Sequence, residues 1–185
     1  MNSSLWLWGG LAVTLFWCVG VYNRLARMQV RGAAALRSVE KHAHRCFALV
    51  DILRGSTSNQ WTTDHAEMAV TSDPELTYLL TAVHALDQTL KDARGGLLGG
   101  QSVAKIGIAF EATQQAWRNW VNVQQQVDQH SIPDDMQAQW DAATLRIRAS
   151  REGLNHILSN YNEAIAQFPA RMLVHAMGFK PTSLM

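Results

Sequence analysis

The residues that could do chemistry are few. His84 lies three residues before Asp87, and His42 and His44 lie shortly before Cys46. On a helix, His84 and Asp87 would share a face, because residues three apart are neighbours on a helical surface. Such a pair could move protons in a site that a partner protein completes, but alone it is a common surface contact. We therefore expect no catalytic residue and no enzymatic activity in the isolated chain.

The histidines and cysteines also lack the spacing of a metal site. Di-metal centres in helical bundles combine carboxylates with Glu-x-x-His pairs, and no Asp or Glu here is followed three residues later by His. His42 and His44 would point about 200° apart around a helix. Cys46 falls in an apolar seam, where cysteine acts as a small hydrophobic residue, and GGLLGG lacks the Lys-Ser/Thr of a phosphate-binding loop. We expect no metal and no cofactor.

Residues 1–23 predict a transmembrane anchor. From residue 5 to residue 23 there is no Asp, Glu, Lys or Arg, and about eighteen apolar or small residues at about 1.5 Å each would cross a bilayer core. The aromatic residues expected to contact the membrane interfaces are Trp6, Trp8, Trp17 and Tyr22. The alternatives are a cleaved signal peptide and a lipid on Cys18; the start MNSSLW has no basic residue and Trp17 is bulky, which disfavours both.

A basic segment follows this anchor. Residues 24–45 carry six basic side chains against one acidic side chain, and those nearest the anchor are Arg24, Arg27 and Arg31. The positive-inside rule then places the N-terminus outside and the bulk of the chain in the cytoplasm, and the arginines could contact anionic lipid headgroups. Residues 46–168 carry fourteen acidic and eight basic side chains, so we expect no nucleic-acid partner.

The remainder predicts an all-α fold, with the transmembrane helix continuing into an antiparallel up-and-down four-helix bundle over residues 24–168. Apolar residues recur at helical spacing, and the first helix should end at Gly55–Asn59. Asp73-Pro74 and Ser102 should begin the second and third helices. The clearest row, in the fourth helix, repeats every seven residues: Trp140, Ile147, Leu154, Tyr161 and Phe168.

Small and polar residues on these seams suggest contacts between helices. Asn155 and Asn162 lie close to the seam of the fourth helix, where a buried Asn can fix the register between helices; a ligand-binding role is the alternative. Gly32 and neighbouring alanines on the first helix could instead pair with a second copy and form a homo-oligomer.

Residues 169–185 predict an amphipathic tail. The fourth helix should return to the membrane, so the tail would begin near the inner leaflet. Its apolar side chains could then dock on lipid, as short interfacial helices do, or cap the end of the bundle. The residues expected to contact the membrane are Met172, Leu173, Met177 and Phe179.

With these elements in place, the chain resembles the LemA family of bacterial membrane proteins. The matching residues are Tyr22-Asn23-Arg24 after the anchor, Tyr161-Asn162, Phe168-Pro169 and Gly178-Phe179 near the end. The sequence departs from the family at Asp51-Ile52, where Pro-Asn is usual, and at Leu154-Asn155, where a Tyr-Asn pair is frequent. The resemblance implies a helical bundle on a single-pass anchor in the bacterial inner membrane, and it implies no established activity.

These features together predict a non-enzymatic membrane protein whose cytoplasmic bundle acts as a scaffold or adaptor. Its partners would be the lipid bilayer and one or more proteins, with a homo-oligomer as a further possibility. Two alternatives stay open. One is a sensor that binds a small ligand on the face that the short second helix leaves open, and the other is an enzyme site at His84 and Asp87 that a partner completes.

Overall fold

The computed structural model describes residues 2–60, 74–94, 101–127, 133–167 and 181–185. It contains four helices: α1 (Asn2–Gln60), α2 (Pro74–Arg94), α3 (Ser102–Val127) and α4 (Asp134–Ala166). No strand occurs within the described ranges. The all-α fold that the sequence predicts is confirmed.

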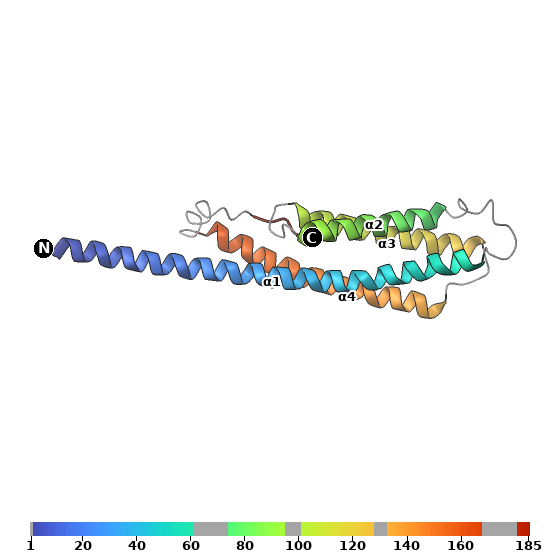
Figure 1. Ribbon diagram of the computed structural model, residues 1–185, viewed down its shortest axis with the longest axis horizontal. Coiled ribbons are helices and arrows are strands. Elements are labelled where there is room, and N and C mark those ends of the chain that lie inside the picture. The colour runs from blue at the N-terminus through green and yellow to red at the C-terminus, as the bar shows by residue number, and fades with distance from the viewer. Residues whose placement is uncertain (1, 61–73, 95–100, 128–132, 168–180) are drawn as a thin grey trace.

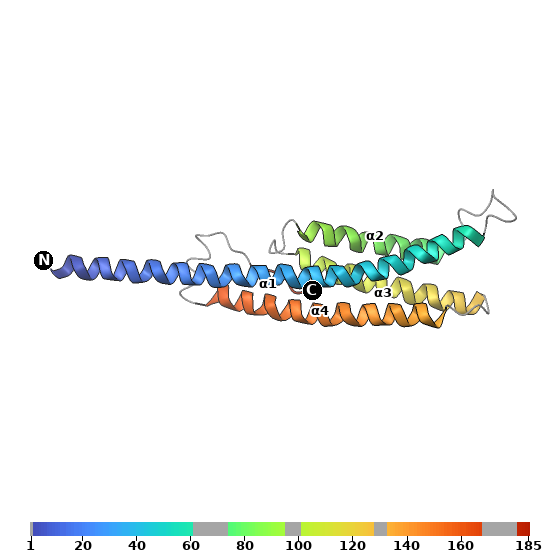
Figure 2. The ribbon, with the colours of Figure 1, turned by 60° about the horizontal axis from the view of Figure 1, so that its bottom comes forward.

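The helices are arranged as two antiparallel pairs. α1 packs along α4 and α2 packs along α3, whereas α1 and α2 touch only briefly (Figure 1, Figure 2). Successive helices run in opposite directions, which is the up-and-down order predicted from the short connections. α2 and α3 are shorter than their neighbours, so the α1–α4 pair extends further toward the N-terminal end of α1 (Figure 1).

The seven-residue row of α4 supplies the centre of the bundle. Its members Trp140, Ile147, Leu154 and Tyr161 are all buried, because apolar residues seven apart stay on one face of a helix. Leu158 and Ile165 flank that row and are buried as well. The fifth predicted member, Phe168, lies outside the described residues.

The second helix begins where the sequence predicts, at Pro74, and the first helix ends later than expected. Pro at the first helical position loses no internal hydrogen bond. α1 continues through Gly55 to Gln60 instead of stopping at residue 54. A glycine in a helix costs only about 1 kcal/mol, and an extra turn on a helix already nucleated adds a hydrogen bond for each residue.

Ser102 is inside α3 and is not the residue before it. The amide of Lys105 donates to the carbonyl oxygen of Gln101, 3.2 Å away. Gln101 therefore occupies the N-cap position, one residue earlier than the sequence predicts.

The C-terminal end of α4 lies beside α1, directly after the apolar N-terminal part of that helix. A small cluster separate from the main core buries Leu25 of α1 against Tyr161, Ala164 and Ile165 of α4. Val21 and Met28 pack against the edge of the same cluster. The fourth helix thus ends next to the predicted anchor, as the alternating directions require.

Gly32 of α1 lies against α4. A Cβ atom placed there would be 3.9 Å from Leu158 and 4.0 Å from Ile157. α4 therefore covers Gly32 itself, while the neighbouring Ala34 is exposed, and pairing with a second copy stays a prediction.

The buried row makes a direct prediction for stability. We expect Leu154→Ala to lower the free energy of unfolding by about 2–5 kcal/mol, because Leu154 is fully buried and its truncation leaves a cavity. Leu145→Ala is the matched control on the same helix; Leu145 is 68% exposed and its truncation should change stability by less than about 0.5 kcal/mol. Chemical denaturation of the detergent-solubilised chain, followed by circular dichroism, measures both. Equal losses of unfolding free energy in the two variants would contradict the predicted buried row of α4.

Candidate functional site

The N-terminal part of α1 is apolar and lies open to its surroundings. Among the described helices, α1 alone is long and apolar enough to cross a membrane. Trp6 and Phe16 are each more than four-fifths exposed, whereas Leu25, at the start of the bundle, is 2% exposed. Large apolar side chains in water are unfavourable at about 25 cal/mol per Å², so burial in an apolar environment would stabilise this surface.

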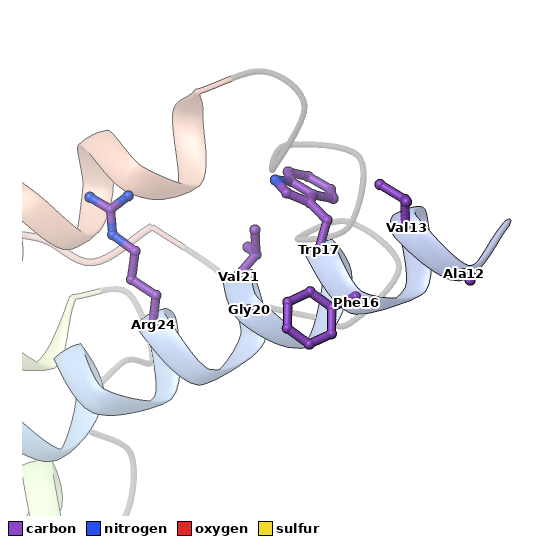
Figure 3. Close-up of a pocket in the computed structure, with 7 residues that line it drawn as sticks. All are labelled: Ala12, Val13, Phe16, Trp17, Gly20, Val21 and Arg24. Atoms are coloured by element: carbon purple, nitrogen blue, oxygen red, sulfur yellow. The ribbon is translucent and has the colours of Figure 1, made fainter. Parts of the chain in front are cut away.

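The exposed surface changes from apolar to basic over a single turn. Figure 3 shows Val13, Trp17 and Val21 along α1, with Arg24 at the end nearest the bundle. Arg24, Arg27 and Arg31 are all exposed, and Arg27 Nε donates to the carbonyl oxygen of Asn23, 3.2 Å away. The other predicted contact residues of this helix are also exposed: Trp6, Trp8, Trp17 and Tyr22.

The two helix pairs meet through side chains along the line where α3 faces α4, which we call the α3–α4 seam. At the end of the seam that is furthest from the N-terminus of α1, the rings of Trp117 and Trp140 stack with centroids 4.0 Å apart and planes 8° apart. Trp117 Nε1 donates to Gln137 Oε1, 3.2 Å away. The packing of large aromatic rings therefore holds one end of the seam.

Polar contacts continue along the seam toward the N-terminal end of α1. One Nη of Arg148 donates to Gln114 Oε1, 2.7 Å away, and one Nη of Arg151 pairs with Glu111 Oε1 at 2.9 Å. The next position on α3, one turn beyond Glu111, is Gly107, which has no side chain to reach across. A different part of the chain fills this space.

The last residues of the sequence fill the gap as an extended segment. Asn162 Nδ2 donates to the carbonyl oxygen of Thr182 (2.7 Å), and the Thr182 amide donates to Asn162 Oδ1 (3.0 Å). Asn155 repeats this with Met185: Nδ2 donates to the carbonyl oxygen (3.0 Å), and Oδ1 accepts from the amide (2.8 Å). Each asparagine thus pairs with both backbone groups of one residue.

Met185 is held from two further sides. Arg151 Nε donates to its carbonyl oxygen, 2.9 Å away. A Cβ atom on Gly107 would lie 3.0 Å from the carbonyl carbon of Met185, so only glycine allows this approach without a shift. We call Gly107, Arg151, Asn155 and Asn162 the tail seat. Within the segment that they hold, Thr182 and Met185 are buried, while Pro181 and Leu184 are exposed.

The tail seat corrects the interpretation of the two asparagines. They bind the backbone of residues 182 and 185 and do not set the register between two helices. The sequence did carry a signal: Asn155 and Asn162 are seven apart, each directly after a member of the buried row, so they project side by side along one edge of α4. Their partners lie twenty and thirty residues away, which spacing alone cannot reveal.

The two residues considered for a partner-completed enzyme site, His84 and Asp87, both lie on α2. His84 is exposed and Asp87 forms an ion pair with Lys91. No group of three or more His, Cys, Asp or Glu able to hold a metal ion occurs in the described part of the chain. Burial, and then the charges of Arg45 and Arg146, lower the pKa of His42, and burial raises the pKa of Tyr161, while a hydrogen bond with Gln29 opposes that rise.

Several residues singled out from the sequence lie outside the described ranges. They comprise the predicted lipid contacts of the tail and part of the family signature: Met172, Leu173, Met177, Phe179, Phe168, Pro169 and Gly178. Their predicted contacts stay predictions. The described signature residues are placed: Asn23 and Arg24 are exposed on α1, Tyr161 is buried, and Asn162 belongs to the tail seat.

Comparison with known proteins identifies no relative. No protein-family model matches the chain, and no curated protein and no solved structure matches it significantly.

The buried thiol of Cys46 gives a testable pH dependence. Burial raises its pKa from 9.0 to about 12, so at pH 8 the folded protein holds about a thousandfold less thiolate than the unfolded chain. In a Cys18→Ser variant we expect iodoacetamide to modify Cys46 only slowly at pH 8 and rapidly in denaturant, because the thiolate is the nucleophile.

The sign of the stability effect follows from the same shift. The folded state holds the Cys46 proton more tightly than the unfolded chain. The resulting contribution to the free energy of unfolding is fully present below pH 9 and is lost as the pH rises toward 12. Equal alkylation rates in native and denaturing buffer would show that Cys46 is not in the core.

Proposed function

We propose that the chain is a non-enzymatic, single-pass membrane protein whose helical bundle acts as a scaffold or adaptor at the inner surface of a bacterial membrane. The observation that carries the proposal is the continuity of α1. A single helix of 59 residues begins with a surface of exposed apolar residues and becomes part of the bundle core at Leu25. A helix of that length spans about 88 Å, enough to cross a bilayer and still run the length of the bundle.

The proposed orientation rests on the charge distribution at the boundary. Arg24, Arg27 and Arg31 follow the apolar surface directly and are exposed, where the positive-inside rule favours the cytoplasmic side. The bundle beyond them is predominantly acidic, so it would stand away from anionic headgroups while the arginines contact them.

Membership of the LemA family remains part of this proposal. It is supported by the residues that resemble the family, and the buried Tyr161 and the tail-binding Asn162 have clear structural roles here. A scaffold role is consistent with the contacts of the described titratable groups, such as the ion pairs of Asp87 with Lys91 and of Glu111 with Arg151. The partner would be a protein that meets the bundle close to the membrane surface.

The topology can be tested with single cysteines in a Cys18→Ser, Cys46→Ser background. We expect a membrane-impermeant maleimide added to intact bacteria to label Ser3→Cys, before the apolar segment, and to spare Ala149→Cys, on the exposed face of α4. Both should react after lysis. Replacing Arg24, Arg27 and Arg31 by Glu should reverse or scramble the pattern, and labelling of Ala149→Cys in intact cells that keep the three arginines would overturn the orientation.

A second candidate function is the binding of a small ligand at the α3–α4 seam. A hollow of about 480 Å³ lies there, lined by Gln114, Trp117, Trp140, Arg118 and Arg148 among others. Gln114 is 3% exposed and its Nε2 has no hydrogen-bond partner, which is costly for a buried donor. The hollow lies between α3 and α4 and not beside α2, where the sequence suggested an open face.

Its lining indicates a small, partly apolar molecule with an anionic or carbonyl group, because two buried tryptophan rings lie beside two guanidinium groups and an unpaired amide. We expect a panel of aromatic carboxylates to include compounds that raise the melting temperature and quench tryptophan fluorescence. Arg148→Gln should remove both effects. Ligand effects that persist in that variant would place binding elsewhere.

A further inference from the structure

We propose that the tail seat is a peptide-binding site that reads the backbone of a short extended segment with the pattern Thr-x-x-Met, and that residues 182–185 are its built-in, exchangeable occupant. This goes beyond the scaffold function, since it assigns a specific site and a class of ligand. It does not depend on which side of a membrane the bundle occupies.

The contacts are of the kind that proteins use to bind peptides. Asn155 and Asn162 make four hydrogen bonds with the backbone amides and carbonyls of two residues, with distances of 2.7 to 3.0 Å. In peptide recognition generally, such backbone bonds supply affinity and pockets for alternate side chains supply specificity. The seat therefore accepts an extended chain regardless of most of its side chains.

Two side chains of the segment are buried against the bundle. Thr182 and Met185 are buried, whereas Leu184, between them, is 48% exposed. Gly107 leaves room for the Met185 backbone to approach α3, and Arg151 adds a charged donor to the Met185 carbonyl. A ligand thus needs a small residue first and a long, unbranched apolar residue fourth.

The attachment is also of a kind that can be released. The segment is held by the side-chain amides of Asn155 and Asn162, by Arg151, and by the buried Met185 side chain, which packs in the core. The α1–α4 and α2–α3 pairings are made by helix residues alone. A segment of the same chain competes with free peptide at a high effective concentration. The intact chain should hence hide a site that the shortened chain exposes.

The test uses the full-length chain in lipid nanodiscs, a version ending at residue 180, and a fluorescent peptide PTSLM. We expect saturable binding by the shortened chain and binding at least about tenfold weaker by the intact chain. Asn162→Asp in the shortened chain should weaken binding about tenfold or more, since the carboxylate has no N–H for the Thr182 carbonyl. Asn160→Ala, at an exposed position two residues earlier, is the control and should bind normally.

One further variant and two altered peptides separate peptide binding from structural support. In the shortened chain, Gly107→Ala should raise the melting temperature, because Ala is the better helix former, and should lower peptide affinity, because its Cβ meets Met185. A peptide with Leu184 replaced by Ala should bind within about twofold, whereas one with Thr182 replaced by Pro should lose about tenfold, because proline has no N–H for Asn162.

The outcome is decisive in each case. If the shortened chain does not fold, the full-length Met185→Asp variant, whose charge is unfavourable in the buried Met185 pocket, takes its place. Saturable binding that Asn162→Asp reduces supports the proposal, as does a dimer that disappears when residues 181–185 are removed. The proposal would be overturned if folded protein did not bind the peptide, or if Asn162→Asp left binding unchanged. Failure of both variants to fold would also overturn it, because the segment would then be a permanent structural part of the bundle.

Discussion

The structure depends on one apolar core to which all four helices contribute. Arg94 of α2 also pairs with Glu40 of α1, and side chains of α3 and α4 meet along the α3–α4 seam. α1 with α4 and α2 with α3 are each closed by apolar rows. Between α3 and α4, in contrast, stacked tryptophans hold one end, charged and amide side chains the middle, and an extended segment of chain the other end. Polar contacts across a partly buried seam are worth less than close apolar packing but are more selective in geometry. This difference explains why both the hollow and the tail seat lie on the same line.

Unequal helix lengths explain why the segment is needed at that end. α2 has 21 residues and α4 has 33, so the C-terminal end of α4 runs beyond the cover of the shorter pair (Figure 2). Leu25 and its neighbours of α1 cover one side of this part. The residues 182–185 cover another, and they do so with backbone atoms, whose donors and acceptors must be paired when buried. The two asparagines supply those partners.

The sequence predicted those parts of the fold that depend on local pattern. The seven-residue row from Trp140 to Tyr161 located the core of α4, and Pro74 located the start of α2, because periodicity and proline geometry act within a few residues. The end of α1 was missed, since Gly55 in a helix already formed is only a weak signal against tertiary context. The tail seat was missed for another reason: its contacts join positions up to thirty residues apart. Only the seven-residue spacing of Asn155 and Asn162 indicated that they could bind a shared partner.

The position of the seat relative to α1 limits what can reach it. Asn162 follows Tyr161, which packs with Leu25 directly after the apolar surface of α1, and Asn155 lies two turns further along, about 10 Å by helix geometry. The segment runs antiparallel to α4, with Thr182 at Asn162 and Met185 at Asn155. With the apolar part of α1 in a bilayer, as proposed, a bound segment would start near the polar boundary and point away from it. Because α1 is a single helix, the distance of the tail seat from the polar boundary is fixed. Chain segments that leave the membrane surface in an extended form are therefore the ones best placed to enter the tail seat.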